Sequence, residues 1–429
     1  MIGLLRNRTT ANSDDLSPHR AVTPSPRRGA CLRPVIHRAK VVVPVTSPAI
    51  EDGAVVVAEG VIVDVGPFRL LRRQWPTAQA WGHDECALLP ALVNAHAHLD
   101  LSGLAGHVQA GGGMAAWIRR LLAAREQGDP VELDLARREA LGAMTALGTG
   151  IVADINSSGS FVGGEVQGAA LIRTFVEVLG LQTKSLQTAL RGQPTEAQQM
   201  LTKGCEDVSL AAHAPYTTSA ALLREVKAWG SARAKVVSVH AAESQEESRF
   251  LRTGQGPLRT LLDERGMLPD RWQPPGCGAV TYLERLGFLD PLSLCVHVCQ
   301  LSEEEIHLLR RSGAGVCLCP RSNIKLGHGL PPVVRLLDAG IPCALGTDSL
   351  ASNDDLNVFK EMFVLMDRCG IGPDAVLTMA TLHGARNLGL GRLYGSLERG
   401  KRWLAIRVAA EDRETIVAAG CQGEVTWIT

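Results

Sequence analysis

The alternation of short apolar segments with helical segments between about residues 89 and 390 constrains the fold of this 429-residue chain most strongly. Eight apolar runs occur in that region: 88–94, 150–155, 174–179, 208–212, 235–239, 293–296, 315–319 and 342–345. Segments with helical spacing of apolar residues lie between most of them. Strands that alternate with helices indicate a parallel sheet, and eight units predict an α/β fold of the (β/α)8, or TIM-barrel, type. A doubly wound sheet is the alternative, but no Gly-x-Gly-x-x-Gly follows the first run, which weakens its dinucleotide-binding form.

The two ends of the chain have a different pattern from the middle. Residues 40–43, 53–60 and 61–65 are rich in β-branched residues, and residues 403–408 and 424–428 are similar. We therefore predict a small β-sandwich domain from residues 39–88 and 391–429, with the barrel, residues 89–390, inserted between its two parts. Residues 1–38 scatter seven arginines among Ser, Thr and Pro, a composition that predicts a disordered basic extension.

Charge and cysteine content narrow the class of partner. The 44 Lys and Arg balance the 44 Asp and Glu, so the neutral chain has no general attraction for nucleic acid or acidic membranes. The sequence has no uninterrupted run of about 18 apolar residues, the length that spans a bilayer. Eleven cysteines without framework spacing indicate a reducing, cytoplasmic environment. We expect a cytoplasmic protein that acts on a small molecule, without a nucleic-acid or membrane partner.

Metal-binding residue types stand where four of the predicted strands end. These ends carry His96 and His98, then His240, His297 and Asp348. In a barrel the carboxyl ends of all strands open on one face, and two His separated by one residue point to the same side. We predict that His96, His98, His240 and Asp348 bind one divalent ion, with a position left open for water.

The chemistry of a metal-assisted hydrolase follows from this set. A bound divalent ion lowers the pKa of its water from about 15.7 to near 7 and so supplies hydroxide at neutral pH. Asp348 can accept the proton of that water, and Glu243, three residues after His240, can carry a proton to the substrate. His297 can polarise the developing oxyanion or hold the water. The fourth predicted strand leads into His213 and has no lysine at its end to bridge a second ion, so we expect a single metal.

Five stretches carry a resemblance to a known family: 89–98, 213–217, 240–243, 319–323 and 345–349. They resemble the cytosine deaminase and triazine hydrolase branch of the amidohydrolase superfamily, from about residue 39 onward. The resemblance implies a (β/α)8 barrel with a β-sandwich from both ends. It implies zinc, with iron(II) as the alternative, held by the residues matching His96, His98, His240 and Asp348. The residues matching Glu243 and His297 assist proton transfer in that family.

Within the branch, two groups look most similar. The sequence His213-Ala-Pro-Tyr216 is similar to that of adenosine and S-adenosylhomocysteine deaminases, whose His helps to position the nucleoside. Residues 98–102, 175–180 and 345–352 look more like aminodeoxyfutalosine deaminases of menaquinone synthesis. Those enzymes commonly have Glu where this chain has Asp100, which we expect to contact the substrate.

Arg321 and Asn323 follow the seventh predicted strand directly. They are further candidates for substrate contacts, and a role in shaping the loop is the alternative.

Three functions fit the sequence. The first is metal-dependent deamination of a 6-aminopurine nucleoside of the aminodeoxyfutalosine or adenosine type, with release of ammonia. The second keeps the site but cleaves another C–N or C–Cl bond of a triazine, guanine or pyrimidine type of heterocycle. The third, a catalytically inactive barrel that serves as a binding protein, predicts a missing ligand or proton shuttle, and the sequence lacks neither. Members of the branch often dimerise, so a homodimer stays open.

Overall fold

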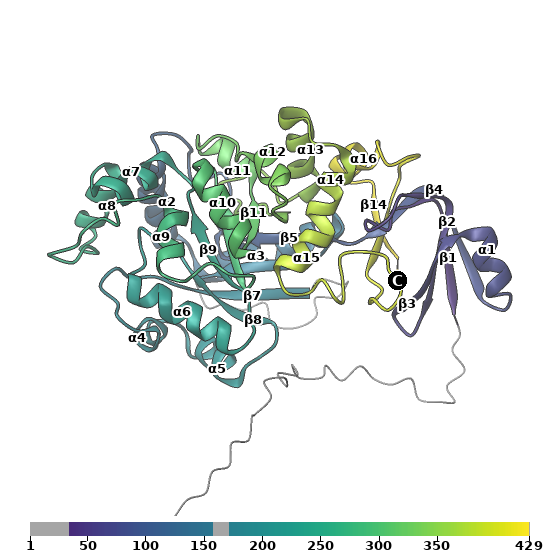
Figure 1. Cartoon of the computed structure of the whole chain (residues 1–429), viewed down its shortest axis with the longest axis horizontal. Coiled ribbons are helices and arrows are strands. Elements are labelled where there is room, and N and C mark those ends of the chain that lie inside the picture. Colours follow the sequence, from purple (N-terminus) through teal and green to yellow (C-terminus); the bar gives the residue numbers. More distant parts are fainter. Residues whose placement is uncertain (1–33, 158–170, 429) are drawn as a thin grey trace, which may run out of the picture.

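The computed structural model describes residues 34–157 and 171–428 of the chain. Within them the chain forms a parallel eight-stranded sheet surrounded by helices and a separate six-stranded mixed sheet. Figure 1 shows the two sheets side by side, with purple N-terminal strands and yellow C-terminal segments meeting in the smaller one.

The eight-stranded sheet is the expected (β/α)8 barrel. Its strands pair in parallel and in sequence order from β5 to β12. They are β5 (Leu92–Ala97), β6 (Thr149–Asn156), β7 (Leu171–Val178), β8 (Val208–Ala212), β9 (Val237–Ala241), β10 (Ser293–His297), β11 (Gly315–Leu318) and β12 (Cys343–Leu345). A parallel bridge between Ala97 and Asp348 joins the last strand region to the first. All eight predicted runs overlap these strands, so the prediction of a TIM barrel is confirmed.

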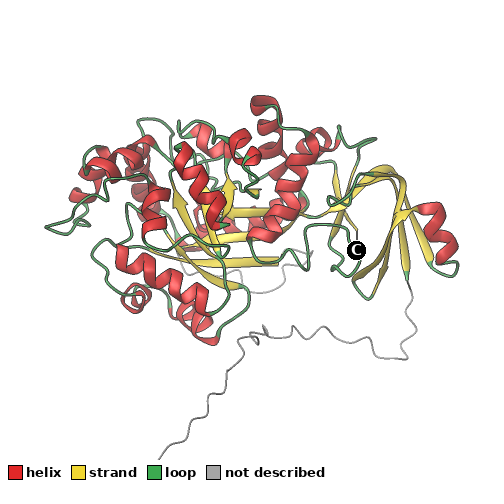
Figure 2. Ribbon diagram, in the orientation of Figure 1, coloured by secondary structure: helices red, strands yellow, loops and turns green. Residues whose placement is uncertain are grey.

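Helices follow most of the barrel strands and cover the outside of the sheet (Figure 2). They are η1 (Leu99–Leu104), α2 (Met114–Gln127), α3 (Pro130–Ala146), α4 (Leu186–Arg191), α5 (Thr195–Lys203), α6 (Ala220–Ala232), α7 (Gln245–Thr253), α8 (Pro257–Glu264), α9 (Ala279–Arg285), α10 (Glu303–Ser312), α11 (Pro320–Lys325), α12 (Val333–Asp338), α13 (Val358–Cys369), α14 (Pro373–Thr378), the π-helical η2 (Met379–His383) and α15 (Gly384–Asn387). Local sequence explains several boundaries. Ser302 and Glu305 form a capping box at the start of α10, and Gly313, with a φ of 70°, ends it.

The six-stranded sheet combines both ends of the described chain. Its order is β14-β13-β4-β1-β2-β3. The strands are β1 (Val35–Val42), β2 (Ile50–Ala58), β3 (Val61–Pro67), β4 (Gln79–Pro90), β13 (Ala405–Val408) and β14 (Val425–Ile428), with helix α1 (Phe68–Gln74) after β3 and α16 (Ile416–Gln422) before β14. The expectation of a small β-domain built from both ends is confirmed.

Two sequence predictions need correction here. The disordered extension was expected over residues 1–38, but β1 already begins at Val35 and pairs with β2 on one side and β4 on the other. Ile36 is fully buried between these strands, which offsets the cost of ordering this short segment. The rest of that expectation, residues 1–33, lies outside the described residues.

The second correction concerns the apolar run 88–94, expected to be the first barrel strand. The structure divides it between two sheets, since β4 ends at Pro90 and β5 begins at Leu92. Between them, the backbone N–H of Ala91 donates to the carbonyl of Leu404 at 3.0 Å. A continuously apolar run carries no periodicity that marks a change of sheet, so this junction could not be predicted from the pattern.

Strands β8 and β9 are buried on both faces, as expected for a barrel wall. One face packs against outer helices such as α6, whose Leu222 and Val226 are fully buried. Within the described part of the chain, no helix is both long and apolar enough to span a membrane.

Candidate active site

The four predicted metal ligands converge at the carboxyl ends of three barrel strands. His240 Nε2 lies 3.3 Å from the Nε2 atoms of both His98 and His96. Asp348 Oδ1 lies 3.8 Å from Nε2 of His96 and 3.8 Å from Nε2 of His98. All four side chains are buried. The structure therefore brings residues separated by about 250 positions to one point, with three imidazoles and one carboxylate facing each other.

The spacing and the protonation of this cluster suit a bound cation. Ligand nitrogens about 2.0–2.1 Å from a tetrahedral zinc ion lie about 3.3 Å from each other. Burial, followed by the neighbouring imidazoles, lowers the pKa of His96 and His240 well below the usual value, so both rings are neutral. The Nδ1 of His240 lies 2.6 Å from the carbonyl oxygen of His213, to which it donates its hydrogen. This leaves the lone pair of His240 Nε2 directed at the cluster, the arrangement a metal ligand needs.

Asp348 is held in place from its other side. Its Oδ2 accepts hydrogen bonds from the hydroxyls of Ser322 at 2.6 Å and Ser352 at 2.8 Å. Burial acts to raise the pKa of this carboxyl, but His297, His98 and the two hydroxyls outweigh burial and hold the pKa below its usual value. Asp348 is therefore an anion with Oδ1 free toward the histidines.

The backbone around these ligands is strained. Ala242, His297, Val298 and Asp348 have φ angles of 53°, 74°, 45° and 60°, a region that side chains with a Cβ rarely adopt. Such residues persist where the surrounding structure fixes them, and they cluster at functional sites. Gly346 makes the turn before Asp348 feasible, because a Cβ there would lie 2.8 Å from the Cβ of His96.

Asn94 connects the first strand of the barrel to the segment after the last. Its Oδ1 accepts the backbone N–H groups of His96 and Thr347, and its Nδ2 donates to the Thr347 hydroxyl at 2.6 Å. The N–H groups of Thr347 and Asp348 both donate to the carbonyl of His96 at 3.1 Å. These bonds fix the position of Asp348 relative to the two histidines of β5.

Glu243 and His297 lie together beside the metal-binding cluster. The Nε2 of His297 is 3.8 Å from Glu243 Oε1. Burial, together with the carboxylates of Asp348 and Glu247, raises the pKa of Glu243 well above its usual value. Burial lowers the pKa of His297. A protonated carboxyl next to a neutral imidazole can donate a proton to a substrate at neutral pH.

Sequence reasoning missed His328, which also faces this pair. Its Nε2 lies 3.6 Å from Glu243 Oε1, and burial followed by His297 lowers its pKa to about 4. His328 lies in the loop between α11 and α12, where no strand end or motif marks it. Its backbone N–H donates to the carbonyl of Asn323 at 2.8 Å, which holds that loop against the site.

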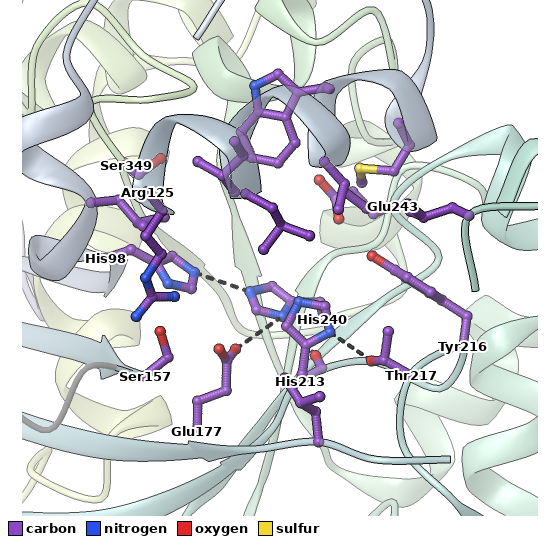
Figure 3. Close-up of a pocket in the computed structure, with 18 of the residues that line it drawn as sticks. His98, Arg125, Ser157, Glu177, His213, Tyr216, Thr217, His240, Glu243 and Ser349 are labelled. Atoms are coloured by element: carbon purple, nitrogen blue, oxygen red, sulfur yellow. Dashed lines mark hydrogen bonds and ion pairs between the residues drawn. The ribbon is translucent and has the colours of Figure 1, made fainter. Parts of the chain in front are cut away.

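The four expected substrate contacts occupy different places. His213 lines the cavity above the cluster, and its Nδ1 lies 2.7 Å from the Thr217 hydroxyl (Figure 3). Asn323 is buried, and its Oδ1 accepts from His297 Nδ1 at 2.9 Å. It contacts a predicted catalytic residue instead of lining the cavity.

Arg321 lies apart from the described lining of the cavity. Its guanidinium points to Asp355, at 2.7 Å, and toward Glu361, and Arg321 is not among the described residues that line the cavity. These contacts suit the loop-shaping role considered for it, and the substrate contact stays a prediction. The carboxylates of Asp355, which is half-buried, and Glu361, which is buried, attract the guanidinium and so orient the side chain of Arg321.

Asp100 also stays behind the cavity wall. Its Oδ2 accepts hydrogen bonds from the backbone N–H of Ser157 at 3.2 Å and from the Ser157 hydroxyl at 2.8 Å. Arg125 lies 3.6 Å from the same carboxylate. Ser157 and Arg125 line the cavity, whereas Asp100 is not among its described lining residues.

The cavity over the cluster encloses about 1140 Å³, its open mouth included. One wall is apolar and comes from α2, α8 and the turn after α8: Met114, Trp117, Ile118, Leu121, Leu122, Leu261, Leu262 and Met267. The other carries polar groups, among them Ser157, Glu177, His213 and Thr217 (Figure 3). A concave, mostly apolar site with a few convergent polar groups at its floor is typical of small-molecule binding.

The fold is a (β/α)8 barrel, and side chains that could hold a metal ion gather at the carboxyl ends of its strands. A model of the Amidohydrolase family matches residues 87–427. The chain therefore belongs to the amidohydrolase family and is a hydrolase that acts on carbon–nitrogen bonds.

Curated relatives support the same assignment. A 5-methylthioadenosine/S-adenosylhomocysteine deaminase of Teredinibacter turnerae is 30% identical over 351 residues, which cover 76% of this chain and 72% of that protein. An aminodeoxyfutalosine deaminase of Deinococcus radiodurans is 30% identical over 370 residues, which cover 82% of this chain and 84% of that protein.

Among solved structures, an adenosine deaminase from Xanthomonas campestris with bound zinc is similar, with a TM-score of 0.70 and 26% identity over 91% of this chain and 90% of that chain. Aminofutalosine deaminase of Helicobacter pylori has a TM-score of 0.79 at 23% identity, over 89% of this chain and 95% of that chain. The second likeness shows the fold alone.

Proposed function

We propose that this chain is a metal-dependent deaminase of 6-aminopurine nucleosides. The observation that carries the proposal is the position of Glu243, whose pKa burial raises well above its usual value, beside three imidazoles and Asp348 at the floor of the cavity. Relatives named as deaminases of methylthioadenosine, S-adenosylhomocysteine and aminodeoxyfutalosine support this choice of substrate class.

The proposed ligands of the metal are His96, His98, His240 and Asp348. Three imidazole nitrogens and one carboxylate oxygen are a donor set that suits zinc, the metal we propose, with iron(II) as the alternative. A divalent cation held by these residues would supply Lewis acidity for the activation of water. One cation is enough for this chemistry.

The neighbouring residues divide the proton transfers between them. Glu243 donates its carboxyl proton to the ring nitrogen beside the amino-bearing carbon. Asp348, with Oδ2 held by two serine hydroxyls, uses Oδ1 to take a proton from the attacking water and to pass one to the departing amino group. His297 donates its Nδ1 hydrogen to Asn323 and so keeps Nε2 as an acceptor that orients Glu243 or the water. Water adds, ammonia leaves, and the hydroxyl left on the ring carbon returns its proton to Glu243, so that the carbon ends as a carbonyl and Glu243 is protonated again.

The apolar wall supports a finer proposal about the substituent at the 5′ carbon of the sugar. Trp117, Leu121 and Leu262 present hydrocarbon surface from α2 and α8 to the cavity. Such a wall favours a nucleoside with an apolar 5′ group over one with a free 5′ hydroxyl, because the hydroxyl would lose its water without gaining a partner. Methylthioadenosine has such a group.

The test is a deamination screen of zinc-loaded protein. Adenosine, methylthioadenosine, S-adenosylhomocysteine and aminodeoxyfutalosine are each incubated with the enzyme, and ammonia is measured together with the absorbance change from 6-aminopurine to 6-oxopurine. We expect release of ammonia with at least one nucleoside, fastest with an apolar 5′ group. If none releases ammonia while a triazine or a pyrimidine is hydrolysed, the proposed substrate class is wrong.

Glu243→Gln tests the assigned proton donor. The amide keeps the size of the side chain but cannot deliver a proton, so we expect kcat to fall by about 100-fold or more. Zinc content should stay at the wild-type level, because Glu243 is not one of the four ligands. Glu304→Gln, a change at an exposed position of α10, is the matched control and should leave both values unchanged. Unchanged turnover of Glu243→Gln would refute the assigned role.

A further inference from the structure

One buried carboxylate in the cavity wall has no part in the proton transfers above. Glu177 lies on β7 and is 5% exposed, and its Oε1 has no hydrogen-bond partner within the described ranges. A buried carboxylate oxygen without a donor is costly, so such a group in a cavity indicates a donor that arrives with the ligand.

The strand aims this side chain into the cavity. Residues two apart on a strand face the same side, and both Glu177 and Leu179, the residue just after β7, line the cavity. Phe175, two positions earlier, fills the core on that same side. The direction of Glu177 is therefore set by β7 and does not depend on a loop.

Among the described residues, no neighbouring group donates a hydrogen bond to Oε1 of this carboxylate. His240 Nδ1 is 3.9 Å from Glu177 Oε1, but its hydrogen is already donated to the carbonyl of His213 at 2.6 Å. The ring of His213 uses Nδ1 with the Thr217 hydroxyl, which leaves Nε2 available to a ligand. Figure 3 shows Glu177 and His213 beside His240, with Glu243 on the other side of that ring.

Asp100 and Glu177 differ in what they can offer a ligand. Asp100 Oδ2 is taken by two hydrogen bonds from Ser157, and Asp100 lies behind the lining of the cavity. Glu177 reaches the cavity directly. The carboxylate that meets the substrate on this side is therefore the one on β7.

We propose that Glu177 is a specificity-determining residue that accepts a hydrogen bond from a hydroxyl of the substrate's sugar, with His213 beside it as the second polar contact. The inference rests on the proposed deamination of nucleosides. A purine ring that presents its amino-bearing carbon to the metal ligands and its ring nitrogen to Glu243 extends its sugar away from both. Glu177 lies on the side of His240 opposite to Glu243 and lines the cavity there.

A second cation between Glu177, His213 and His240 is the competing explanation, since their ligand atoms lie within 4.8 Å of one another. It is disfavoured because His240 Nδ1 carries the hydrogen that bonds to the His213 carbonyl, so this nitrogen has no lone pair to give. Two remaining protein ligands make a weak site. A neutral hydroxyl needs only one acceptor.

The experiment compares the deamination of adenosine, 2′-deoxyadenosine and 3′-deoxyadenosine by wild type, Glu177→Ala and Glu177→Gln, all loaded with zinc. We expect wild type to lose about 10- to 100-fold in kcat/KM when the recognised hydroxyl is removed. Glu177→Ala should lose a similar factor with adenosine and no longer distinguish it from that deoxynucleoside. Glu206→Gln, at an exposed position before β8, is the control and should discriminate like wild type.

Glu177→Gln keeps the shape of the side chain and protects the test against a variant that does not fold. Removing a buried charge should leave the urea midpoint of the zinc-free protein equal to that of wild type or higher.

Equal discrimination by wild type and Glu177→Ala would overturn the inference and leave the deaminase function intact. A zinc content that falls from two ions to one per chain in Glu177→Gln would overturn it in favour of the second cation. If wild type deaminates no nucleoside, the proposed function fails and the inference fails with it.

Discussion

At the scale of residues, the sequence predicts which side chains gather and misses how they are oriented. His96, His98, His240 and Asp348 could be named because ligand residue types stand at strand ends of a predictable barrel. Their hydrogen-bond partners could not, since Ser322 and Ser352 come from loops whose conformation no local pattern fixes. Glu177 was within reach of sequence reasoning, because strand alternation places it on the same side as Phe175.

Asn323 gives a test at this scale. Its Oδ1 accepts the Nδ1 hydrogen of His297 and thereby keeps Nε2 of that ring as an acceptor toward Glu243. Asn323→Ala should lower kcat by about 10- to 100-fold with little change in zinc content, because the orientation and tautomer of His297 are no longer fixed. Asn323→Asp retains an acceptor oxygen and should recover most of the activity. A change confined to KM in Asn323→Ala would instead support the direct substrate contact first expected for Asn323.

At the scale of elements, most strands were predictable and one junction was not. The barrel strands carry short apolar runs, so their number and order follow from the sequence. Strand β4 was missed because residues 83–86 are His, Asp, Glu and Cys, which interrupt the apolar pattern. It is stabilised instead by neighbours on both sides, a parallel partner in β1 and an antiparallel partner in β13.

Helix α13 contacts α11 and the segment after β12 through the side chain of Glu361, which is fully buried. Its carboxylate accepts hydrogen bonds from the backbone N–H of Arg321 and from Asn353 Nδ2, both at 2.9 Å. The same Asn353 Nδ2 donates to the carbonyl of Thr347 at 2.9 Å. Burial nevertheless raises the pKa of Glu361 to about 8.

This pKa predicts a pH-dependent stability. Between the usual Glu pKa of about 4.5 and about 8, the folded chain holds a proton on Glu361 that the unfolded chain releases. The contribution of Glu361 to the free energy of unfolding is therefore complete below pH 4.5. It falls as the pH rises toward 8, by up to about 1.4 kcal/mol per pH unit. This pH dependence is measured by urea unfolding of the zinc-free wild type and of Glu361→Gln at pH 5.5 and at pH 8.5. We expect the variant to lose less stability than wild type over this interval, and parallel losses would contradict the raised pKa.

At the scale of the whole molecule, a bound cation would hold together the first and the last strand of the barrel, which are neighbours in space and far apart in the sequence. His96 lies on β5 and His98 directly follows it, whereas Asp348 follows β12, and the two segments are joined by one parallel bridge. If zinc binds only the folded chain, it raises the free energy of unfolding by about 2.7 kcal/mol at a free zinc concentration 100 times its Kd.

Chelation of the metal should therefore lower the melting temperature, and added zinc should restore it. For a chain of this size we expect a shift of a few degrees, measured by scanning calorimetry with a chelator and after dialysis against zinc. His96→Ala removes one of the four ligands and should melt at a temperature that responds much less to either treatment. A wild-type melting temperature unaffected by chelation would contradict the metal site.

The small mixed sheet has a consequence for synthesis on the ribosome. Strand β4 leads into the first barrel strand, yet its neighbour β13 begins only at Ala405, more than 300 residues later. The nascent chain therefore exposes one edge of β4 during almost all of its elongation. Folding during translation can close the barrel first, but this edge stays open to wrong partners until the final segment emerges from the exit tunnel.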